Sequence, residues 1–152
     1  MKKLLQVLGV ILILAGCPTP YPPPAPNPGP PSAKNASYSS FSYQLSNSVS
    51  RGSSTDYTHW LSIDLSNLST NVNTISAVTI TIQFTFTNGG STVGPSTETL
   101  SPMLTSSLPI LPTADRTIYF EDDCSLSGSG WSFSYTVLSV NITWSDGTPQ
   151  VL

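Results

Sequence analysis

Charged side chains are scarce in this sequence of 152 residues, because Asp, Glu, Lys and Arg together make up only 9% of it. An average soluble domain has roughly 25%. Hydrophobic residues account for 38%, and Ser and Thr supply much of the remainder. A disordered chain combines low hydrophobicity with high net charge, and outside one Pro-rich stretch this sequence has neither. We therefore expect a folded domain with an uncharged, hydroxyl-rich surface.

Basic residues are the scarcest charged group. Lys2 and Lys3 belong to an N-terminal segment described below, which leaves Lys34, Arg51 and Arg116 against eight acidic side chains, a balance of 3 − 8 = −5. Binding to nucleic acid requires clustered Lys and Arg that neutralise phosphates. Attraction to an anionic lipid surface requires a polybasic segment. The composition therefore excludes a nucleic-acid partner and a purely electrostatic membrane contact.

Groups for acid–base catalysis are also scarce, since His59 is the single histidine. A Ser-His-Asp arrangement can be drawn with the nearby Asp56 and one of many serines. However, His59 is in phase with Leu61 and Ile63 on an apolar strand face, which favours a half-buried structural histidine. No Gly-x-Ser-x-Gly motif is present. We therefore expect no catalytic residues and no cofactor, and a hydrolase-like enzyme is the last alternative.

The N-terminus carries the features of an export signal. Lys2 and Lys3 precede the apolar segment 4–14, and Leu14-Ala15-Gly16-Cys17 follows. The apolar segment is shorter than the roughly 20 residues that span a bilayer, and it matches a secretory signal with small residues before the cleavage site. An ordinary signal peptide followed by an unrelated cysteine is the alternative.

The Leu-Ala-Gly-Cys tetrad resembles the lipobox of prokaryotic lipoproteins. In that family a dedicated peptidase cuts before the cysteine, and the cysteine sulfur carries diacylglycerol. The resemblance covers about the first seventeen residues and implies lipidation at Cys17. Two acyl chains suffice for stable anchoring. We therefore expect a lipid-anchored protein on the outer side of a prokaryotic membrane, in the cell envelope or at the cell surface.

A Pro-rich stretch follows the cysteine. Nine of the fourteen residues 18–31 are Pro, a composition that favours polyproline II and spans about 40 Å at roughly 3.1 Å per residue. We interpret it as a semi-rigid stalk, with a docking site for a Pro-recognising module as the alternative. The predicted organisation is a signal peptide at 1–16, an acylated cysteine and stalk at 17–35, and a folded domain at 36–152.

The folded part has a hydrophobic period of two, which indicates β-strands. Within Val78–Thr87, β-branched and aromatic residues alternate with hydroxyl residues, and Asn88-Gly89-Gly90-Ser91 then suits a hairpin turn. Similar runs are Phe41 to Leu45, Tyr57 to Leu65, the short run Thr117 to Phe120, and Trp131 to Trp144. In the last run the phase changes between Val137 and Leu138, which predicts a bulge or a strand that changes sheets.

These runs predict an all-β fold. We expect an antiparallel β-sandwich of immunoglobulin-like size with about six to eight strands. The likeness to immunoglobulin domains is architectural only, because Cys124 is the one cysteine beyond residue 17 and no Cys…Trp…Cys pattern exists. Acidic residues before Cys124 would raise its pKa and disfavour a nucleophilic role. An odd cysteine in an exported chain leaves an intermolecular disulfide open.

Two sets of residues are candidate sites. Glu121, Asp122 and Asp123 are weak candidates for Ca²⁺ ligands, although their spacing matches no calcium loop and a solvated turn is the favoured interpretation. Trp60 is out of phase with the apolar face of its strand, so it should face solvent beside Ser62 and Asp64. Exposed aromatic rings can stack on sugars or on a protein partner. We therefore expect any binding to involve Trp60 rather than His59 or Cys124.

The combined expectation is a non-catalytic surface lipoprotein that presents a β-module for interaction or structure. Its partners would be the membrane, through the lipid anchor, and an envelope protein or a glycan. The main alternative is a subunit of a surface assembly or fibre. In that case the uncharged segment Val78–Thr87 would lie at an exposed edge and accept an added strand.

Overall fold

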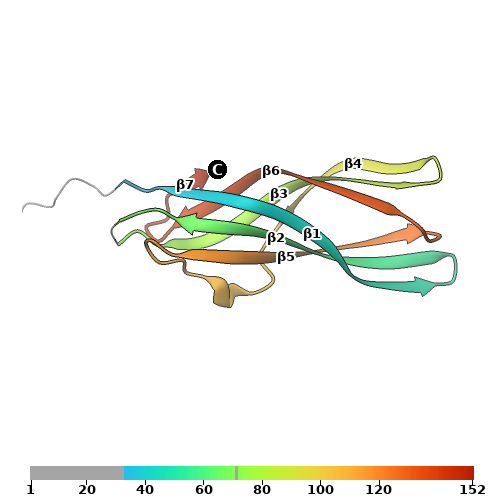
Figure 1. Cartoon of the computed structure of the whole chain (residues 1–152), viewed down its shortest axis with the longest axis horizontal. Helices are drawn as coiled ribbons and strands as arrows, with labels where there is room; N and C mark the ends of the chain where they lie inside the picture. Colours follow the sequence, from blue (N-terminus) through green and yellow to red (C-terminus); the bar gives the residue numbers. More distant parts are fainter. Residues whose placement is uncertain (1–32, 71) are drawn as a thin grey trace, which may run out of the picture.

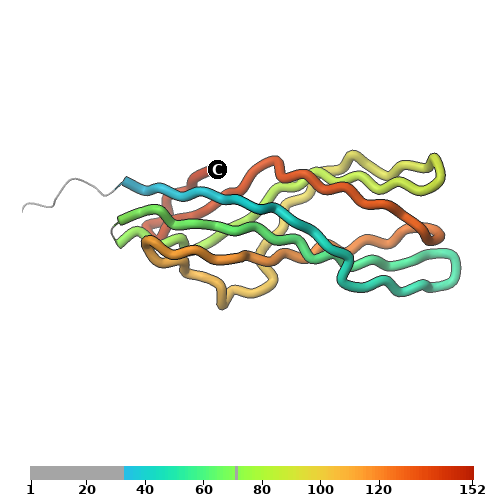
Figure 2. The backbone as a smooth tube through the Cα atoms, in the orientation of Figure 1, coloured from blue at the N-terminus to red at the C-terminus, as the bar shows by residue number. Residues whose placement is uncertain are grey.

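The computed structural model describes residues 33–70 and 72–152 (Figures 1 and 2). The predicted signal peptide, Cys17 and the Pro-rich stretch up to residue 32 lie outside the described residues. The described part contains seven strands and one short 3₁₀ helix, in the order β1 (Ala36–Arg51), β2 (Ser54–Asn67), β3 (Ile75–Asn88), β4 (Ser91–Leu100), η1 (Thr105–Ser107), β5 (Asp115–Ser127), β6 (Ser132–Trp144) and β7 (Pro149–Val151).

The strands form two antiparallel sheets that pack face to face. One sheet has the order β1-β2-β5 and the other the order β4-β3-β6-β7. The core between them consists of the inward side chains of both sheets, chiefly Leu, Ile, Val and aromatic residues. The predicted all-β sandwich of six to eight strands is confirmed. Among residues 33–70 and 72–152, no helix has the length and apolar character needed to cross a membrane.

Strand β3 shows why the alternating pattern becomes a strand. Val78, Ile80, Ile82 and Phe86 are buried, and the hydroxyl residues between them face outward. β-branched and aromatic side chains fit a pleated, half-buried surface. However, β3 is hydrogen-bonded to β4 on one side and to β6 on the other. The prediction of an exposed edge at Val78–Thr87 is therefore wrong, because both sides of that segment are paired.

Strand β6 contains the predicted change of phase. Ser139 pairs with Thr81 and Val137 pairs with Ile82, so Leu138 has no partner in the register. This is a β-bulge, in which one extra residue reverses the side-chain alternation. The bulge prediction is confirmed, and β6 remains in one sheet. The alternation that begins at Leu138 would place this residue on the same face as Val140 and Ile142, but Leu138 is 53% exposed whereas the other two are buried.

Strands β2 and β5 pair along almost their whole length, from Ser54 opposite Ser127 to Ser66 opposite Asp115. The short strand predicted at Thr117 to Phe120 is thus part of a strand of 13 residues. The sequence indicates only the short strand because acidic residues follow Phe120. Asp122 is nevertheless buried between the exposed residues Glu121 and Asp123, and residue type does not reveal this alternation. β2 follows its predicted alternation without interruption.

The sandwich is elongated, and its two ends differ (Figure 1). The hairpin connections β1–β2, β3–β4 and β5–β6 lie together at one end, and β1 begins at the opposite end. There, the Lys34 ammonium group pairs with Asp146 and donates to the Thr148 hydroxyl in the β6–β7 turn. A segment that precedes β1 therefore joins the domain at the end away from the three hairpins.

Candidate binding face

Trp60 lies on the outer face of the β1-β2-β5 sheet, the face that points away from the other sheet. Its side chain is 42% exposed, so its predicted outward orientation is confirmed. In the register, Gln44 of β1 and Glu121 of β5 lie on either side of Trp60. One row along, Ser62 of β2 lies opposite Tyr119 of β5, which is 45% exposed. Trp60 and Tyr119 are therefore diagonal neighbours on one face.

The loop between β4 and β5 completes this surface. The backbone N–H of Met103 donates to the Tyr119 carbonyl oxygen at 2.9 Å, which brings the exposed side chains of Met103 and Leu104 beside the ring of Tyr119. A groove of about 360 Å³ is lined by Gln44, Trp60, Met103, Leu104 and Tyr119. We call this set of five residues the Trp60 groove.

Sequence reasoning missed most of the Trp60 groove. Tyr119 could have been found, because it lies between the inward residues Ile118 and Phe120 of an alternating run. No sequence pattern identifies Met103 and Leu104 as part of the groove, because they belong to an irregular loop. The position of this loop depends on hydrogen bonds to a distant strand. Beside the groove, a polar hollow of about 210 Å³ is also lined by Ser42 and Ser62, whose hydroxyls lie 2.8 Å apart.

Acidic side chains surround the Trp60 groove. The outer face of this sheet carries five of the eight acidic residues in the sequence, namely Asp56, Asp64, Asp115, Glu121 and Asp123. Asp56 forms an ion pair with Arg51, with Nε and Oδ2 2.7 Å apart. Within the described residues, no Lys or Arg forms an ion pair with the other four. The face therefore has a strongly negative and largely uncompensated surface.

The acidic run Glu121, Asp122 and Asp123 is not a solvated turn, which corrects that interpretation. It lies inside β5, where alternation sends Glu121 and Asp123 outward and buries Asp122. The three carboxylates therefore do not converge, and within the described residues no group of three potential metal ligands gathers. The weak Ca²⁺ candidates are thus separated by the pleat of the strand.

Asp122 belongs to a polar cluster in the interior. The Tyr135 hydroxyl of β6 donates to Asp122 Oδ2 at 2.6 Å, which joins the two sheets. Burial, and then the hydrogen bond to Asp122, raises the pKa of Tyr135. Glu98 in β4 is an exposed residue, and its pKa is also raised, first by partial desolvation and then by the charge of Asp122 and a hydrogen bond with it. The cluster thus connects β4, β5 and β6.

His59 is almost completely buried, at 1% exposure, which corrects the expected half-burial. Its ring centroid lies 4.3 Å from that of Phe133 and 5.4 Å from that of Tyr135. Among the described residues, neither ring nitrogen has a hydrogen-bond partner. Burial lowers the pKa of His59, and the nearby charges of Asp122 and Asp123 partly oppose this shift. Asp56 points to the other face of β2, so the arrangement drawn from sequence does not form.

Cys124 is a free thiol and is partly buried. Burial raises its pKa to about 11, and the charges of Asp122 and Asp123 contribute in the same direction. A thiol reacts as its thiolate, so this environment disfavours nucleophilic chemistry. The sequence had predicted the direction of this shift from the neighbouring acidic residues, whereas the larger cause is burial.

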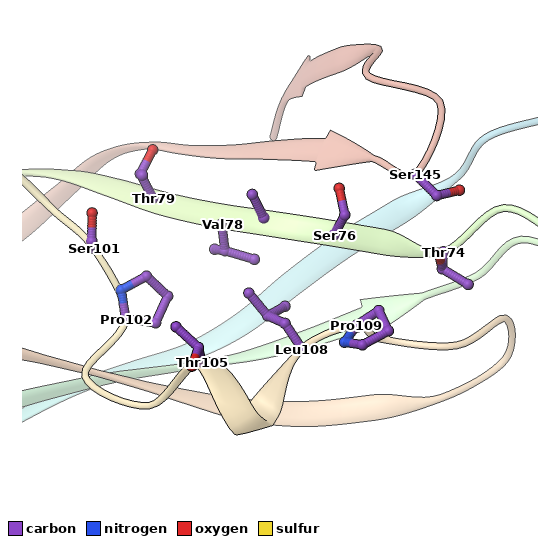
Figure 3. A pocket seen from close by; sticks show the side chains of 11 residues that line it. Thr74, Ser76, Val78, Thr79, Ser101, Pro102, Thr105, Leu108, Pro109 and Ser145 are labelled. Atoms are coloured by element: carbon purple, nitrogen blue, oxygen red, sulfur yellow. The ribbon is translucent and has the colours of Figure 1, made fainter.

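A second groove, of about 660 Å³, lies between the start of β3 and the β4–β5 loop (Figure 3). Its walls include Val78 and Thr79 on one side and Pro102, Leu108 and Pro109 on the other. All of its lining side chains are hydroxyl or apolar. This groove therefore offers packing and hydroxyl contacts but no titratable group for acid–base chemistry.

Comparisons with known proteins add little to this description. No protein family and no curated protein matches the sequence. A solved structure, Northeast Structural Genomics Consortium target SoR45, is similar to this chain with a TM-score of 0.44 and 11% sequence identity, over 76% of this chain and 79% of that one. A likeness at this level carries no conclusion about function.

Proposed function

We propose that this protein is a lipid-anchored module of the cell envelope or cell surface that binds a partner through the Trp60 groove without catalysing a reaction. The observation that carries this proposal is the groove itself. Two aromatic rings and two apolar loop side chains are exposed together, at the centre of an otherwise hydrophilic sheet face. A contiguous exposed apolar patch rimmed by polar residues is a feature of protein interaction sites.

The composition of the groove suits binding. Aromatic residues and Met are enriched at the centres of protein interfaces, where polar residues form the rim. Here Trp60, Tyr119 and Met103 form the centre, and Gln44 and the serine hydroxyls of the adjoining hollow provide hydrogen-bonding groups at its margin. Trp60 and Tyr119 lie on β2 and β5, which pair without a register shift from Ser54 to Ser66, so both aromatic side chains project from regularly paired strands.

The anchor is the second part of the proposal. It rests on Leu14-Ala15-Gly16-Cys17 and on the Pro-rich residues 18–31. Because β1 begins at one end of the elongated sandwich (Figure 1), a stalk attached there would direct the three hairpins away from the membrane. The outer face of β1-β2-β5 would then lie along the side of the domain. The test of the anchor is mass spectrometry of the mature N-terminus, in which a lipidated Cys17 is expected.

The binding face is tested by photo-cross-linking in the native host. A photoreactive amino acid replaces Ser62, beside the groove, or, as a control, Gln83 on the exposed face of the other sheet. We expect a discrete cross-linked product from position 62 alone, and its loss when Trp60→Ala is added. Equal cross-linking from both positions, or a product that survives Trp60→Ala, would contradict the proposal.

Folding of the Trp60→Ala protein is controlled separately. Substitutions of exposed residues usually change stability by less than about 0.5 kcal/mol, so the melting temperature should stay within a few degrees of that of the parent. Leu61→Ala, at the adjacent buried position, is the matched comparison and should cost about 2–5 kcal/mol. This pair distinguishes loss of binding from loss of the fold.

A further inference from the structure

On the basis of the proposed binding role of this face, we propose that its partner is a cationic polypeptide segment. Lys or Arg side chains of that segment would stack on Trp60 and Tyr119 and pair with the surrounding carboxylates. The proposal rests on two independent features of the same face, which are the exposed aromatic rings and the acidic side chains that lack a cationic partner within the described residues.

The aromatic rings supply the first feature. A cation over the face of Trp or Tyr is attracted by the quadrupole of the ring, and Arg does this more often than Lys. Trp60 and Tyr119 occupy diagonal positions on neighbouring strands, and their exposed surfaces line one groove with the amide of Gln44. The aliphatic stem of Lys or Arg can also cover apolar surface, which Met103 and Leu104 provide at the loop side of the groove.

The carboxylates supply the second feature. Glu121 lies directly opposite Trp60 in the register, and Asp123 lies one row further along, opposite Thr58. Asp64 lies on the other side, beyond Ser62. Rows on one face repeat every two residues, or roughly 7 Å along a strand. A cation on Trp60 therefore has Glu121 in the same row, and a cation on Tyr119 has Glu121 and Asp64 in the two adjacent rows.

Two of these carboxylates are already held in position. The Thr58 hydroxyl donates to Asp123 Oδ1 at 2.6 Å, and the Thr117 hydroxyl donates to Asp64 Oδ1 at 2.7 Å. A carboxylate has two oxygens with several acceptor sites, so each of them retains acceptor capacity for a ligand. The threonine contacts reduce the side-chain freedom that would be lost when a cation binds.

The same charges disfavour other occupants. An anionic ligand would be repelled by four carboxylates that have no ion pair within the described residues. A second copy of this chain, once residues 1–16 are removed as proposed, would present only Lys34, Arg51 and Arg116 against its own eight acidic side chains. Lys34 and Arg51 are already paired with Asp146 and Asp56. A neutral glycan would use the rings but leave the carboxylates uncompensated. Charge complementarity therefore favours a basic peptide segment.

The experiment uses the full chain in a non-ionic detergent, with hexaarginine as the probe. Its matched control is hexacitrulline, which keeps the planar end group but not the charge. We expect hexaarginine alone to bind and to shift the indole N–H resonance of Trp60. Raising the salt to about 1 M, where the screening length falls to roughly 3 Å, should weaken binding at least tenfold.

Three variants locate the binding. Trp60→Ala should weaken hexaarginine binding about two- to fivefold, the factor that corresponds to an exposed cation–π contact. Glu121→Gln should weaken it about two- to fivefold, as expected for one exposed ion pair. Asp146→Asn makes the same change in net charge at the β6–β7 turn and should leave the affinity unchanged. Trp60→Phe should retain part of the binding.

Each other outcome overturns the proposal. Equal binding of hexacitrulline would show that charge is not recognised, and equal weakening by Glu121→Gln and Asp146→Asn would show attraction by net charge alone. Trp60-dependent binding of a chitin or glucan oligosaccharide, without binding of hexaarginine, would overturn the cationic partner and leave the proposed binding face intact. If hexaarginine does not bind but the cross-link from position 62 persists, only this inference fails.

Discussion

His59 is an unusual core residue, because a titratable ring whose two nitrogens have no hydrogen-bond partner among the described residues lies among aromatic side chains. Burial lowers the pKa of His59 in the folded state below its ordinary value of 6.5. The unfolded chain therefore binds this proton more tightly than the native chain. In the interval between the lowered pKa and about 6.5, stability rises with pH and is lost as the pH falls through that interval.

The test is the substitution His59→Leu, which removes the titration and the two unpartnered polar atoms. We expect the variant to melt at a similar or higher temperature near pH 7.5, since unpaired buried polar groups cost about 1–3 kcal/mol. Its melting temperature should fall less than that of the parent between about pH 6.5 and 5.5. Circular dichroism measures both curves.

Glu98 contributes to the pH dependence of stability with the opposite sign. Because its pKa is raised in the folded protein, Glu98 adds stability as the pH falls toward 4.5. Glu98 is present both in the parent protein and in His59→Leu. The difference between the two melting curves therefore isolates the contribution of His59. An identical acid dependence in the parent and in His59→Leu would show that His59 does not titrate with folding.

The thiol of Cys124 gives a second prediction at the residue scale. With its pKa raised to about 11 by burial and by Asp122 and Asp123, it has far less thiolate near neutrality than a free cysteine. In a Cys17→Ser chain, we expect iodoacetamide to label native Cys124 at least tenfold more slowly at about pH 8 than the same thiol in urea. Labelling at equal rates would place the side chain in an open, unperturbed environment.

At the scale of elements, the bulge in β6 controls which residues of that strand reach the core. Leu138 is the extra residue and is exposed, whereas Ile142, in the same strand, is buried. We expect Leu138→Ala to change the free energy of unfolding by less than about 0.5 kcal/mol. Ile142→Ala should cost about 2–5 kcal/mol. Urea unfolding of the two variants measures the difference, and similar losses would mean that the register of β6 is different.

The connection between β4 and β5 supplies the apolar wall of the Trp60 groove, through Met103 and Leu104. It returns from the edge of the four-stranded sheet, forms the Ile110–Ile75 bridge, and pairs Met103 with Tyr119. These backbone bonds fix the loop against both sheets. The apolar side of the proposed binding face thus depends on a segment without regular strand structure.

For the whole molecule, the described core is formed within residues 33–152. The two sheets bury a continuous cluster that includes Trp144 of β6 and Phe120 of β5. We therefore expect a protein consisting of residues 33–152 to give a β-type circular dichroism spectrum and a cooperative melt. The transition followed by tryptophan fluorescence should coincide with the transition followed by circular dichroism. Separate transitions would show that the sheets unfold independently.

The alternation of residue types determined much of the fold. A strand sends successive side chains to opposite faces, so the sequence alone predicted segments of β1, β2, β3, β5 and β6, the inward face of β2, the outward position of Trp60 and the change of phase beside Leu138. These are local properties of the chain. They need no knowledge of which strand lies next to which, and for that reason they were predictable. The sequence alone did not predict β4 and β7, which lack a clear alternation.

Only the tertiary structure decided which strands are neighbours. It placed Val78–Thr87 between two strands rather than at an edge, and it divided the acidic run between the core and the surface. It also brought Met103 to Tyr119 and aligned Glu121 with Trp60. Pairing and register between distant segments depend on long-range hydrogen bonds and on packing across the sandwich, and local alternation carries no information about either.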